Sequence, residues 1–331
     1  MRNILVFSDI FFHFSETFLY QQVKNLKKDF KVTICGNQFI NKEIYSFEGF
    51  ELLEFDENLN RFDKYLTKLL RKVYDPTLDF GILRTWKLHS FFKNFKGIIH
   101  THFGTHAVKM LRFAKKNNLP LVVTFHGYDA SRALNNKKYV KRLPGLFNYA
   151  SAIIVVSPHM IEKLGLAPWI NKVHVIPCSI DTGEFKPGTR QNAPDGKTIH
   201  LIHAGRLVEK KGVLDLITVF YELLQLTPSL KLHILGDGPE KEKCVNHARQ
   251  LGIEHKIVFY GAKPHSFVKQ LMQDCDIFVL NSRVAANGDS EGMPVTLLEA
   301  MSMEKAVVST IHAGIPLAIE DHVHGILVPE K

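Results

Sequence analysis

Several common protein classes are excluded by what this sequence of 331 residues does not contain. No stretch approaches the roughly 20 apolar residues of a membrane-spanning helix. The apolar N-terminus is interrupted by Asp9 and His13, and no small-residue cleavage site follows, which predicts a first strand and not a signal peptide. The four cysteines are widely spaced without a CxxC pair, so neither a disulfide framework nor a zinc site is expected. A reducing, cytoplasmic location fits this pattern.

The nucleotide-binding and nucleophile motifs with the clearest mechanisms are also missing. There is no GxGxxG, no GxxxxGK[ST] and no GxSxG. Residues 236–240 read GDGPE after a predicted strand, which indicates a tight turn into a helix and not a dinucleotide fingerprint. His100 and His102 are one residue apart, but no carboxylate or cysteine has matching spacing. We therefore expect ordinary strand and loop histidines there, no metal site and no cofactor.

Length and composition are those of a two-domain globular protein. The chain has a mass of 37.8 kDa, 45% hydrophobic and 23% charged residues, and a net charge of +9. The charge is uneven, with about +12 in residues 1–190 and about −3 in residues 191–331. The basic part could face an anionic membrane, an anionic substrate or nucleic acid. Composition alone does not choose among them.

Strand-like and helical patterns alternate in both halves. Continuous apolar runs, expected as strands, occur at 3–8, 31–35, 97–101, 121–125, 151–157, 172–176, 198–203, 231–235, 256–260, 276–280 and 306–309. Helical patterns occur at 16–28, 61–74, 105–117, 213–226, 240–251, 266–273 and 294–303. Such alternation predicts an α/β protein with two Rossmann-like parallel-sheet domains. Proline and glycine cluster in 177–197, so we expect domains at 1–180 and 181–331.

The helical pattern at 61–74 has one apolar face surrounded by lysine and arginine. The aromatic residues Trp86, Phe91, Phe92 and Phe95 follow among more basic residues. A basic amphipathic helix of this kind can lie on an anionic bilayer. The same pattern would result if the apolar face packed on the sheet and the lysines were solvated. Both interpretations remain open.

An anion site is predicted in the second half from two segments. Arg206 follows the strand of the first segment at its carboxyl end, and Lys211 begins the next helix. In the second segment Pro294 suits the first turn of a helix, whose unpaired N–H groups can receive an anion. Glu291 precedes that helix and Glu299 lies within it. We expect Val295, Leu298, Met301 and Ser302 to share one helix face. A carboxylate at 299 could be an ordinary surface Glu or, if buried, a group that needs ligand hydroxyls.

Two further candidates lie in the first half. His126 follows the predicted strand 121–125 at its carboxyl end, next to Gly127. Ser15 and Glu16 follow the first strand, where Ser15 would cap a helix. Their N–H groups could also meet a phosphate, although capping alone explains them.

These segments together resemble a known family. GRLVEKKG, GDGPE and EGMPVTLLEAM, in that order, are similar to motifs of the retaining GT-B glycosyltransferases of family 4. Glu291 and Glu299 match its E-x7-E pair. VIPCSIDTGEFKP resembles the family's junction stretch, and FSETFL and TFHGYD resemble exopolysaccharide transferases of the colanic acid and amylovoran type. The resemblance covers nearly the whole chain.

The resemblance implies a GT-B fold, with two Rossmann-like domains facing a cleft, and a role for each matched residue. Arg206 and Lys211 would bind the donor diphosphate, and the N–H groups of residues 292–295 (Gly292, Met293, Pro294, Val295) would cradle phosphate. Glu299 would bind the ribose hydroxyls, and Glu291 and His126 the transferred sugar. Ser15 and Glu16 stand where many members have a Gly-Gly loop that is absent here. Members continue past GILVPEK, so the chain looks C-terminally truncated.

The function expected from this resemblance is metal-independent transfer of a hexosyl unit with retention. The donor would be a nucleotide sugar, UDP-hexose before GDP-mannose, and the acceptor a glycan or lipid-linked glycan, at the inner face of the plasma membrane. One alternative is a sugar-nucleotide epimerase or hydrolase of the same fold, which would need no acceptor. The other is a non-catalytic protein whose basic half binds a membrane or nucleic acid, although no aromatic-basic nucleic-acid module is present.

Overall fold

The computed structural model divides the chain into two compact units, Met1–Ile176 and Pro177–Lys331. It describes residues 1–11, 17–42, 45–54, 82–190 and 198–330. The division lies four residues before the boundary expected from the sequence. Within the described ranges no helix is both long and apolar enough to span a bilayer.

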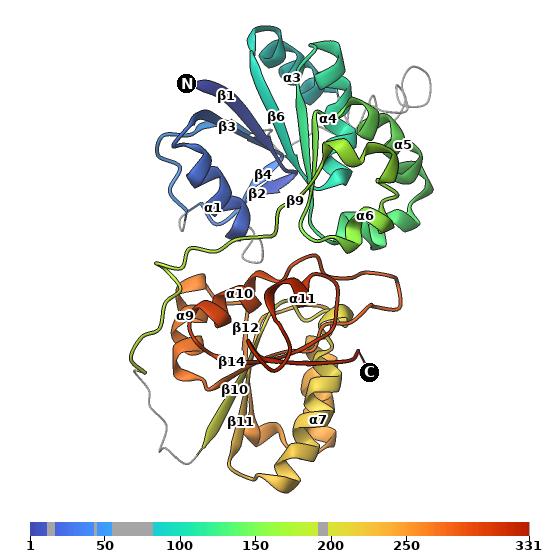
Figure 1. Cartoon of the computed structure of the whole chain (residues 1–331). Coiled ribbons are helices and arrows are strands. Elements are labelled where there is room, and N and C mark those ends of the chain that lie inside the picture. Colours follow the sequence, from blue (N-terminus) through green and yellow to red (C-terminus); the bar gives the residue numbers. More distant parts are fainter. Residues whose placement is uncertain (12–16, 43–44, 55–81, 191–197, 331) are drawn as a thin grey trace. The chain divides into compact units, whose positions relative to one another are not determined.

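The first unit is built on a seven-stranded parallel sheet in the order β5-β3-β1-β6-β7-β8-β9. The strands are β1 (Arg2–Phe7), β3 (Phe30–Gly36), β5 (Glu51–Glu54), β6 (Gly97–His102), β7 (Leu121–Phe125), β8 (Ala152–Val155) and β9 (Val173–Val175). Two short strands, β2 (Ile10–Phe11) and β4 (Gln38–Phe39), pair separately. The α-helices are α1 (Thr17–Leu26), α3 (Ile82–Asn94), α4 (Gly104–Lys116), α5 (Lys137–Tyr149) and α6 (His159–Lys163). Helices flank this sheet in Figure 1.

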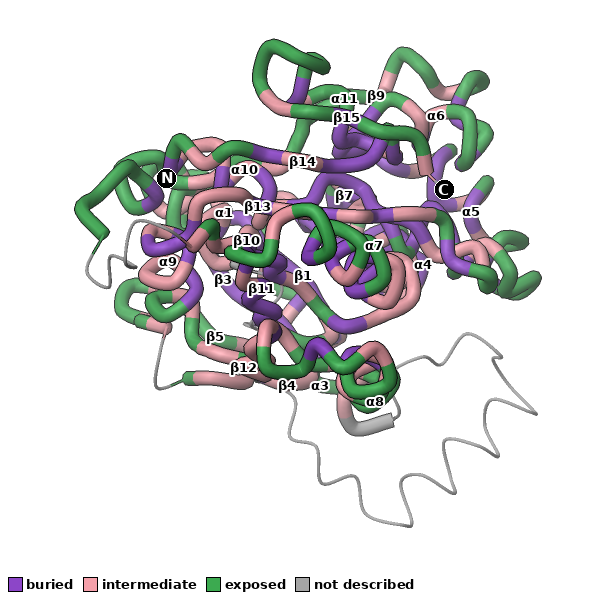
Figure 2. Tube along the Cα trace, turned by 90° about the horizontal axis from the view of Figure 1, so that it is seen from below, coloured by how far each residue is buried: buried purple, intermediate pink, exposed green. Residues whose placement is uncertain are grey.

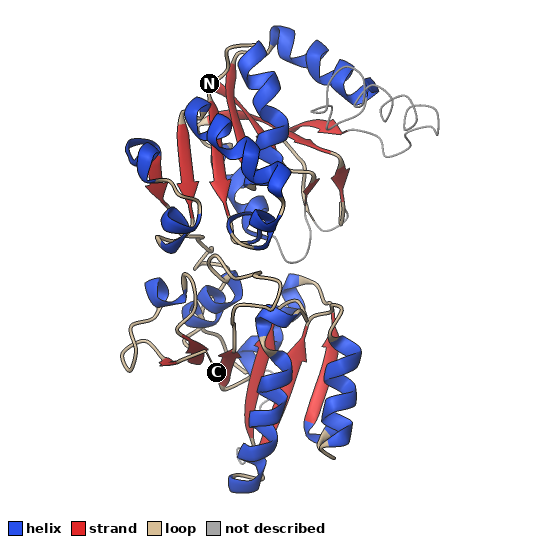
Figure 3. Ribbon diagram, turned by 90° about the vertical axis from the view of Figure 1, so that its right-hand side faces the viewer, coloured by secondary structure: helices blue, strands red, loops and turns tan. Residues whose placement is uncertain are grey.

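The second unit has a six-stranded parallel sheet in the order β12-β11-β10-β13-β14-β15. Its strands are β10 (Ile199–Ala204), β11 (Leu230–Leu235), β12 (Ile257–Gly261), β13 (Ile277–Leu280), β14 (Ala306–Thr310) and β15 (Ile326–Val328). Its helices are α7 (Val213–Leu226), α8 (Lys241–Gln250), α9 (His265–Asp274), α10 (Val295–Ser302) and α11 (Ile315–Ala318). Helices again lie against the strands in Figure 3.

In each sheet the strand that comes first in the sequence lies in the interior, and the strands that follow it in the sequence are added first on one side and then on the other. In the second unit β10 lies between β11 and β13, which gives the doubly wound order 3-2-1-4-5-6. In the first unit β1 lies in the same way between β3 and β6. Strand order reverses at these points, and the loops that leave the carboxyl ends there diverge to leave a crevice where ligands bind in such sheets. The sites are therefore expected after β10 and β13, and after β1 and β6.

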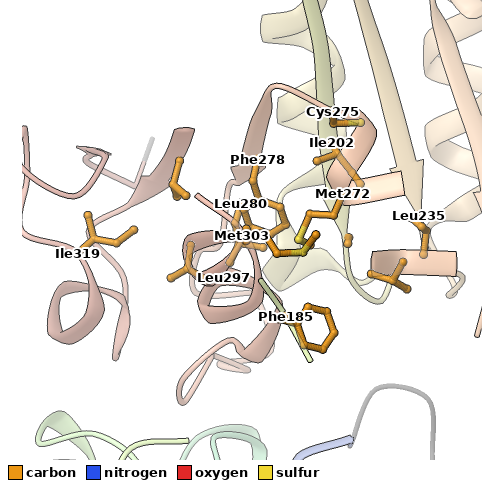
Figure 4. Packing of buried hydrophobic residues seen from close by; sticks show 14 of the residues in the cluster. Phe185, Ile202, Leu235, Met272, Cys275, Phe278, Leu280, Leu297, Met303 and Ile319 are labelled. Carbon is orange, nitrogen blue, oxygen red and sulfur yellow. The ribbon is translucent and has the colours of Figure 1, made fainter. Parts of the chain in front are cut away.

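Apolar strands make the core of each unit. In Figure 2 the buried residues run along the central strands, whereas exposed ones concentrate on helices and loops. One cluster in the second unit joins the strands to α9 and α10 (Figure 4). Its fully buried members include Ile202 of β10, Phe278 of β13 and Leu297 of α10. This packing fixes α10, the helix that carries Glu299, against the sheet.

The predicted α/β architecture with two Rossmann-like sheets is confirmed, and the element boundaries agree to within a few residues. Several elements were missed, among them α3, β15, β5 and α5. β5 is an edge strand with a glutamate at each end, so it shows no apolar run. α5 contains Pro144 and Gly145, which resemble a turn, yet its face of Tyr139, Leu143, Leu146 and Phe147 is buried. The amphipathic pattern at 61–74 lies outside the described residues.

Candidate active site

Lys211 and Glu291 form a buried ion pair at the point where strand order reverses in the second unit. Lys211 closes the short 3-10 turn after β10, and Glu291 lies in the loop between β13 and α10. Lys211 Nζ lies 3.0 Å from Glu291 Oε1, with 11% and 10% of the two side chains exposed. Two residues that are 80 positions apart in the sequence thus share one site.

A glycine makes this close approach of two loops possible. Gly212 has φ of 60°, and a Cβ there would lie 2.2 Å from the carbonyl oxygen of Asn281. Asn281 Nδ2 donates to the Gly212 carbonyl at 3.2 Å. The Arg283 N–H donates to the Lys210 carbonyl at 2.8 Å, which joins the loops at a further point. A side chain at position 212 would push the loops apart and separate Lys211 from Glu291.

Electrostatics keep Glu291 ionised. Burial raises its pKa, but the nearby charges of Lys211 and Lys210 outweigh that effect and hold the pKa at about 2. Lys210 also bonds Asp289 at 3.2 Å. The site therefore combines two lysines with two carboxylates, those of Glu291 and Asp289. Cationic donors beside carboxylate acceptors suit a ligand that carries both anionic and hydroxyl groups.

Arg206 lies two residues beyond β10 and is exposed. The turn that follows β11 supports this segment, because a Cβ on Gly236 would lie 1.8 Å from the Gly205 carbonyl oxygen. The Leu207 N–H donates to the Asp237 carbonyl at 2.9 Å. The GDGPE segment, which was expected to form a tight turn, therefore supports the loop that carries Arg206 and leads to Lys211.

Within the described residues, the N-terminus of α10 has unpaired N–H groups as expected, but Pro294 lies before the first turn and not in it. Gly292, Met293 and Pro294 are buried, and Pro294 caps the helix in an extended conformation instead of lying in its first turn. Proline has no N–H, so only the N–H groups of Gly292, Met293 and Val295 could cradle a phosphate. No described side chain caps this helix end. The eight-residue helix therefore keeps first-turn donors that can meet an anion.

Glu299 is buried, with 1% of the residue exposed, so the surface interpretation was wrong. Its Oε1 lies 2.9 Å from His265 Nε2, and its Oε2 has no hydrogen-bond partner among the described residues. Burial lowers the pKa of His265, but the hydrogen bond and charge of Glu299 raise it more. A buried carboxylate oxygen without a protein partner is costly, and ligand hydroxyls would satisfy it.

The four residues expected to share one face of α10 do not form its buried face. Leu297 and Ala300 are fully buried, whereas Val295, Leu298, Met301 and Ser302 are only partly buried. The helix is apolar around most of its circumference, so periodicity could not identify the inner face. Because Leu297 and Ala300 form the buried side of the helix, Glu299, which lies between them in the sequence, is buried as well.

His126 lies in the first unit, one residue past β7, and contacts another histidine. Its Nε2 lies 2.9 Å from His102 Nδ1, its Nδ1 has no partner among the described residues, and Phe18 packs on its ring. Burial, followed by the charges of His100 and His106, lowers its pKa to about 3. His126 is therefore a neutral imidazole with one buried ring nitrogen that lacks a hydrogen-bond partner among the described residues.

Asp129 orders the backbone beside His126 and was not singled out from the sequence. It is fully buried, and its carboxylate accepts the N–H groups of Gly104, His126 and Gly127 at 2.7, 2.9 and 3.1 Å. Its place in TFHGYD was the available signal. His102, set aside as an ordinary strand histidine, and His265 were missed as well, because their partners lie far away in the sequence.

Ser15 and Glu16 lie outside the described residues. Across the described ranges, no group of three or more His, Cys, Asp or Glu side chains is arranged to hold a metal ion. The four cysteines are free thiols.

Two family models match this chain. The model described as Glycosyltransferase Family 4 matches residues 15–184, more than half of the chain, and that of Glycosyl transferases group 1 matches residues 187–331. The chain belongs to glycosyltransferase family 4. The matched regions contain the whole second sheet and every strand of the first sheet except β1.

Two bacterial relatives carry names of exopolysaccharide biosynthesis. WcaL of Escherichia coli, named for colanic acid biosynthesis, is 31% identical over 235 residues, which are 70% of this chain and 57% of WcaL. The amylovoran biosynthesis glycosyltransferase AmsK of Erwinia amylovora is 30% identical over 236 residues, again 70% and 57%. The matched region is thus a little over half the length of these relatives.

Solved glycosyltransferase structures share the fold. Alr3699/HepE of Anabaena, in complex with UDP and glucose, covers 99% of this chain and 86% of its own at a TM-score of 0.77 and 18% identity. Sucrose-phosphate synthase from Thermosynechococcus elongatus covers 100% and 86% at a TM-score of 0.75 and 16% identity. The GT-B fold expected from the sequence is confirmed.

Proposed function

We propose that this chain transfers a hexosyl unit from a nucleotide sugar to a glycan or lipid-linked glycan acceptor with retention, in surface polysaccharide synthesis. The second unit would bind the donor and the first the acceptor. The observation that carries the proposal is the buried Lys211–Glu291 pair, which joins a cation to an ionised carboxylate where strand order reverses. Family membership and the names of WcaL and AmsK support it.

The proposed chemistry depends on charge stabilisation of the departing diphosphate. Arg206, Lys211 and the N–H groups at the start of α10 would hold the developing negative charge without a metal ion. Glu299 would bind the ribose hydroxyls through its unpartnered Oε2. Glu291 and His126 would bind the transferred sugar. With front-face attack, the acceptor hydroxyl passes its proton to the leaving phosphate oxygen, and no side-chain base is required.

The donor is proposed to be UDP-hexose in preference to GDP-mannose. Support comes from the HepE structures, which are described in complex with UDP, with UDP and glucose, and with UDP-glucose. The basic first unit is proposed to contact an anionic membrane from the cytoplasmic side. Its described part offers Trp86, which is 70% exposed, and the neighbouring exposed Lys87 on α3. Ser15 and Glu16 stay candidates for a donor-phosphate contact.

The experiment is a panel of sugar nucleotides scored by the rise in melting temperature, followed by product analysis with the best donor. UDP-hexoses should stabilise the protein more than GDP-mannose, and EDTA should leave transfer unchanged. Transfer to an acceptor supports the proposal. Free sugar or an epimer formed without acceptor would indicate the hydrolase or epimerase, and no response to any nucleotide would reject the donor site.

A further inference from the structure

His312 links Glu291 to the end of the second sheet. It lies two residues beyond β14 and is 2% exposed. Its Nε2 lies 3.1 Å from the backbone nitrogen of Glu291, and its Nδ1 lies 2.5 Å from Glu330 Oε1. Glu330 follows β15, so three loops at the carboxyl edge of the sheet are connected through one imidazole.

The hydrogen bonds fix the tautomer of this imidazole. A backbone N–H can only donate, so Nε2 of His312 must accept with its lone pair. The ring proton therefore lies on Nδ1 and is donated to the Glu330 carboxylate. The other oxygen of Glu330, Oε2, accepts the N–H of Val284 at 2.9 Å. One carboxylate thus orients His312 and also fastens the loop that leads from β13 to Glu291.

Glu291 is consequently held from two sides. Lys211 contacts its carboxylate, and His312 contacts its backbone N–H. The peptide plane before Glu291 is held at both ends, because Lys210 Nζ donates to the Ser290 carbonyl at 3.2 Å and the Glu291 N–H donates to His312. Loss of the His312 contact would let this plane tilt about its remaining bond, so that the carboxylate could shift while staying near Lys211. We infer that His312 and Glu330 are positioning residues that fix Glu291 for the hydroxyls of the transferred sugar. This inference rests on the proposed function.

A role limited to general loop support makes a different prediction. The same loop leads into Gly292 and α10, whose N–H groups are proposed to bind phosphate. If His312 and Glu330 only supported the loop, their loss would weaken UDP and UDP-sugars equally. If they position Glu291, their loss should remove the additional affinity that the sugar provides and leave the affinity for UDP unchanged.

The variants are chosen to separate the individual contacts. Glu330→Gln keeps the size of the side chain but leaves one acceptor oxygen for two donors, so one of them loses its partner. His312→Leu removes the acceptor for the Glu291 N–H, whereas His312→Gln can replace it with an amide oxygen. Glu304→Gln makes the same charge change at an exposed position of the same unit and is the matched control.

Calorimetry with UDP, UDP-glucose, GDP and GDP-mannose gives the main result. Glu330→Gln and His312→Leu should bind the preferred sugar nucleotide about tenfold more weakly, the size of one hydrogen bond, with diphosphate affinity unchanged. His312→Gln should recover most of the loss, and Glu304→Gln should match the parent. Equal loss of sugar nucleotide and diphosphate, or no loss, would overturn the inference while leaving the proposed function intact. If the unsubstituted protein binds no nucleotide, the proposed function itself fails and the inference fails with it.

Nitrogen NMR of His312 tests the contact without any ligand. The unsubstituted protein should show a protonated Nδ1 and a bare Nε2. The opposite tautomer would contradict the hydrogen-bond chain, whatever the binding data show.

Discussion

His102 Nδ1 and His126 Nε2 lie 2.9 Å apart in the first unit, and both rings are held neutral by burial. His100 and His106 complete the group, with pKa values lowered by burial to about 4. An unfolded chain would protonate these histidines near pH 6.5, whereas the folded chain does not. The free energy of unfolding is therefore undiminished by these histidines above pH 6.5, and it decreases as the pH falls toward 4.

We predict that the first unit loses stability between pH 6.5 and 4, by up to about 1.4 kcal/mol per pH unit for each such histidine. Both tryptophans, Trp86 and Trp169, belong to this unit, so urea unfolding followed by their fluorescence reports on it. His100→Gln should flatten the pH dependence, because the amide can keep the 2.8 Å bond to Thr124 Oγ1 without titrating. The exposed His174→Gln is the control. An identical slope in His100→Gln and the parent would contradict this account.

Replacing Lys211 with Met should destabilise the second unit strongly. The Glu291 carboxylate would remain buried without its 3.0 Å partner, and removing one member of a buried pair costs about 3–5 kcal/mol. Adding Glu291→Gln to the same chain should recover much of that loss, because no uncompensated charge then remains. Unfolding followed by circular dichroism measures both, and Lys243→Met on the surface of α8 is the matched control. A double variant as unstable as Lys211→Met alone would show that the pair is not the cause.

The same carboxylate predicts acid sensitivity of the second unit. The pKa of Glu291 is held at about 2, below its ordinary value of 4.5. A lowered pKa of this kind contributes stability above pH 4.5 that disappears as the pH falls toward 2. Circular dichroism during urea unfolding at pH 5 and pH 3 should therefore show a smaller decrease in Glu291→Gln than in the parent. Equal decreases in both proteins would rule out this contribution.

Arg206 should separate function from stability. Its side chain is exposed, so Arg206→Ala should change the free energy of unfolding by no more than about 0.5 kcal/mol. If the guanidinium stabilises the leaving diphosphate, transfer should fall on the order of 10²-fold. Arg249→Ala, an exposed arginine on α8, should affect neither quantity. Transfer at the parental rate by Arg206→Ala would remove the proposed role.

The fold and the motif residues of the candidate site could be predicted from the sequence, but the partners of those residues could not. Apolar runs alternating with helices specify parallel strands, and the motif residues mark the loops that leave their carboxyl ends. The partners of those residues were not predictable. His265 meets Glu299, and His102 meets His126, only after separate strands have been assembled in a fixed order. The direction of Glu299 was also hidden, because α10 is apolar on most sides and only its packing on β13 and β14 chooses the buried face.

The unpartnered Oε2 of Glu299 leads to a prediction about the ribose of the donor. If this oxygen accepts a ribose hydroxyl, the protein should bind UDP about tenfold more tightly than 2′-deoxy-UDP, since a buried carboxylate would otherwise lack its partner. Glu299→Leu should bring the two affinities together by weakening UDP alone. Its neighbour His265 keeps 24% of its side chain exposed and can bond water instead, so the fold should persist. Calorimetry with both nucleotides measures the difference. A preference for UDP that survives in Glu299→Leu would place ribose recognition elsewhere, because no acceptor would then remain at position 299.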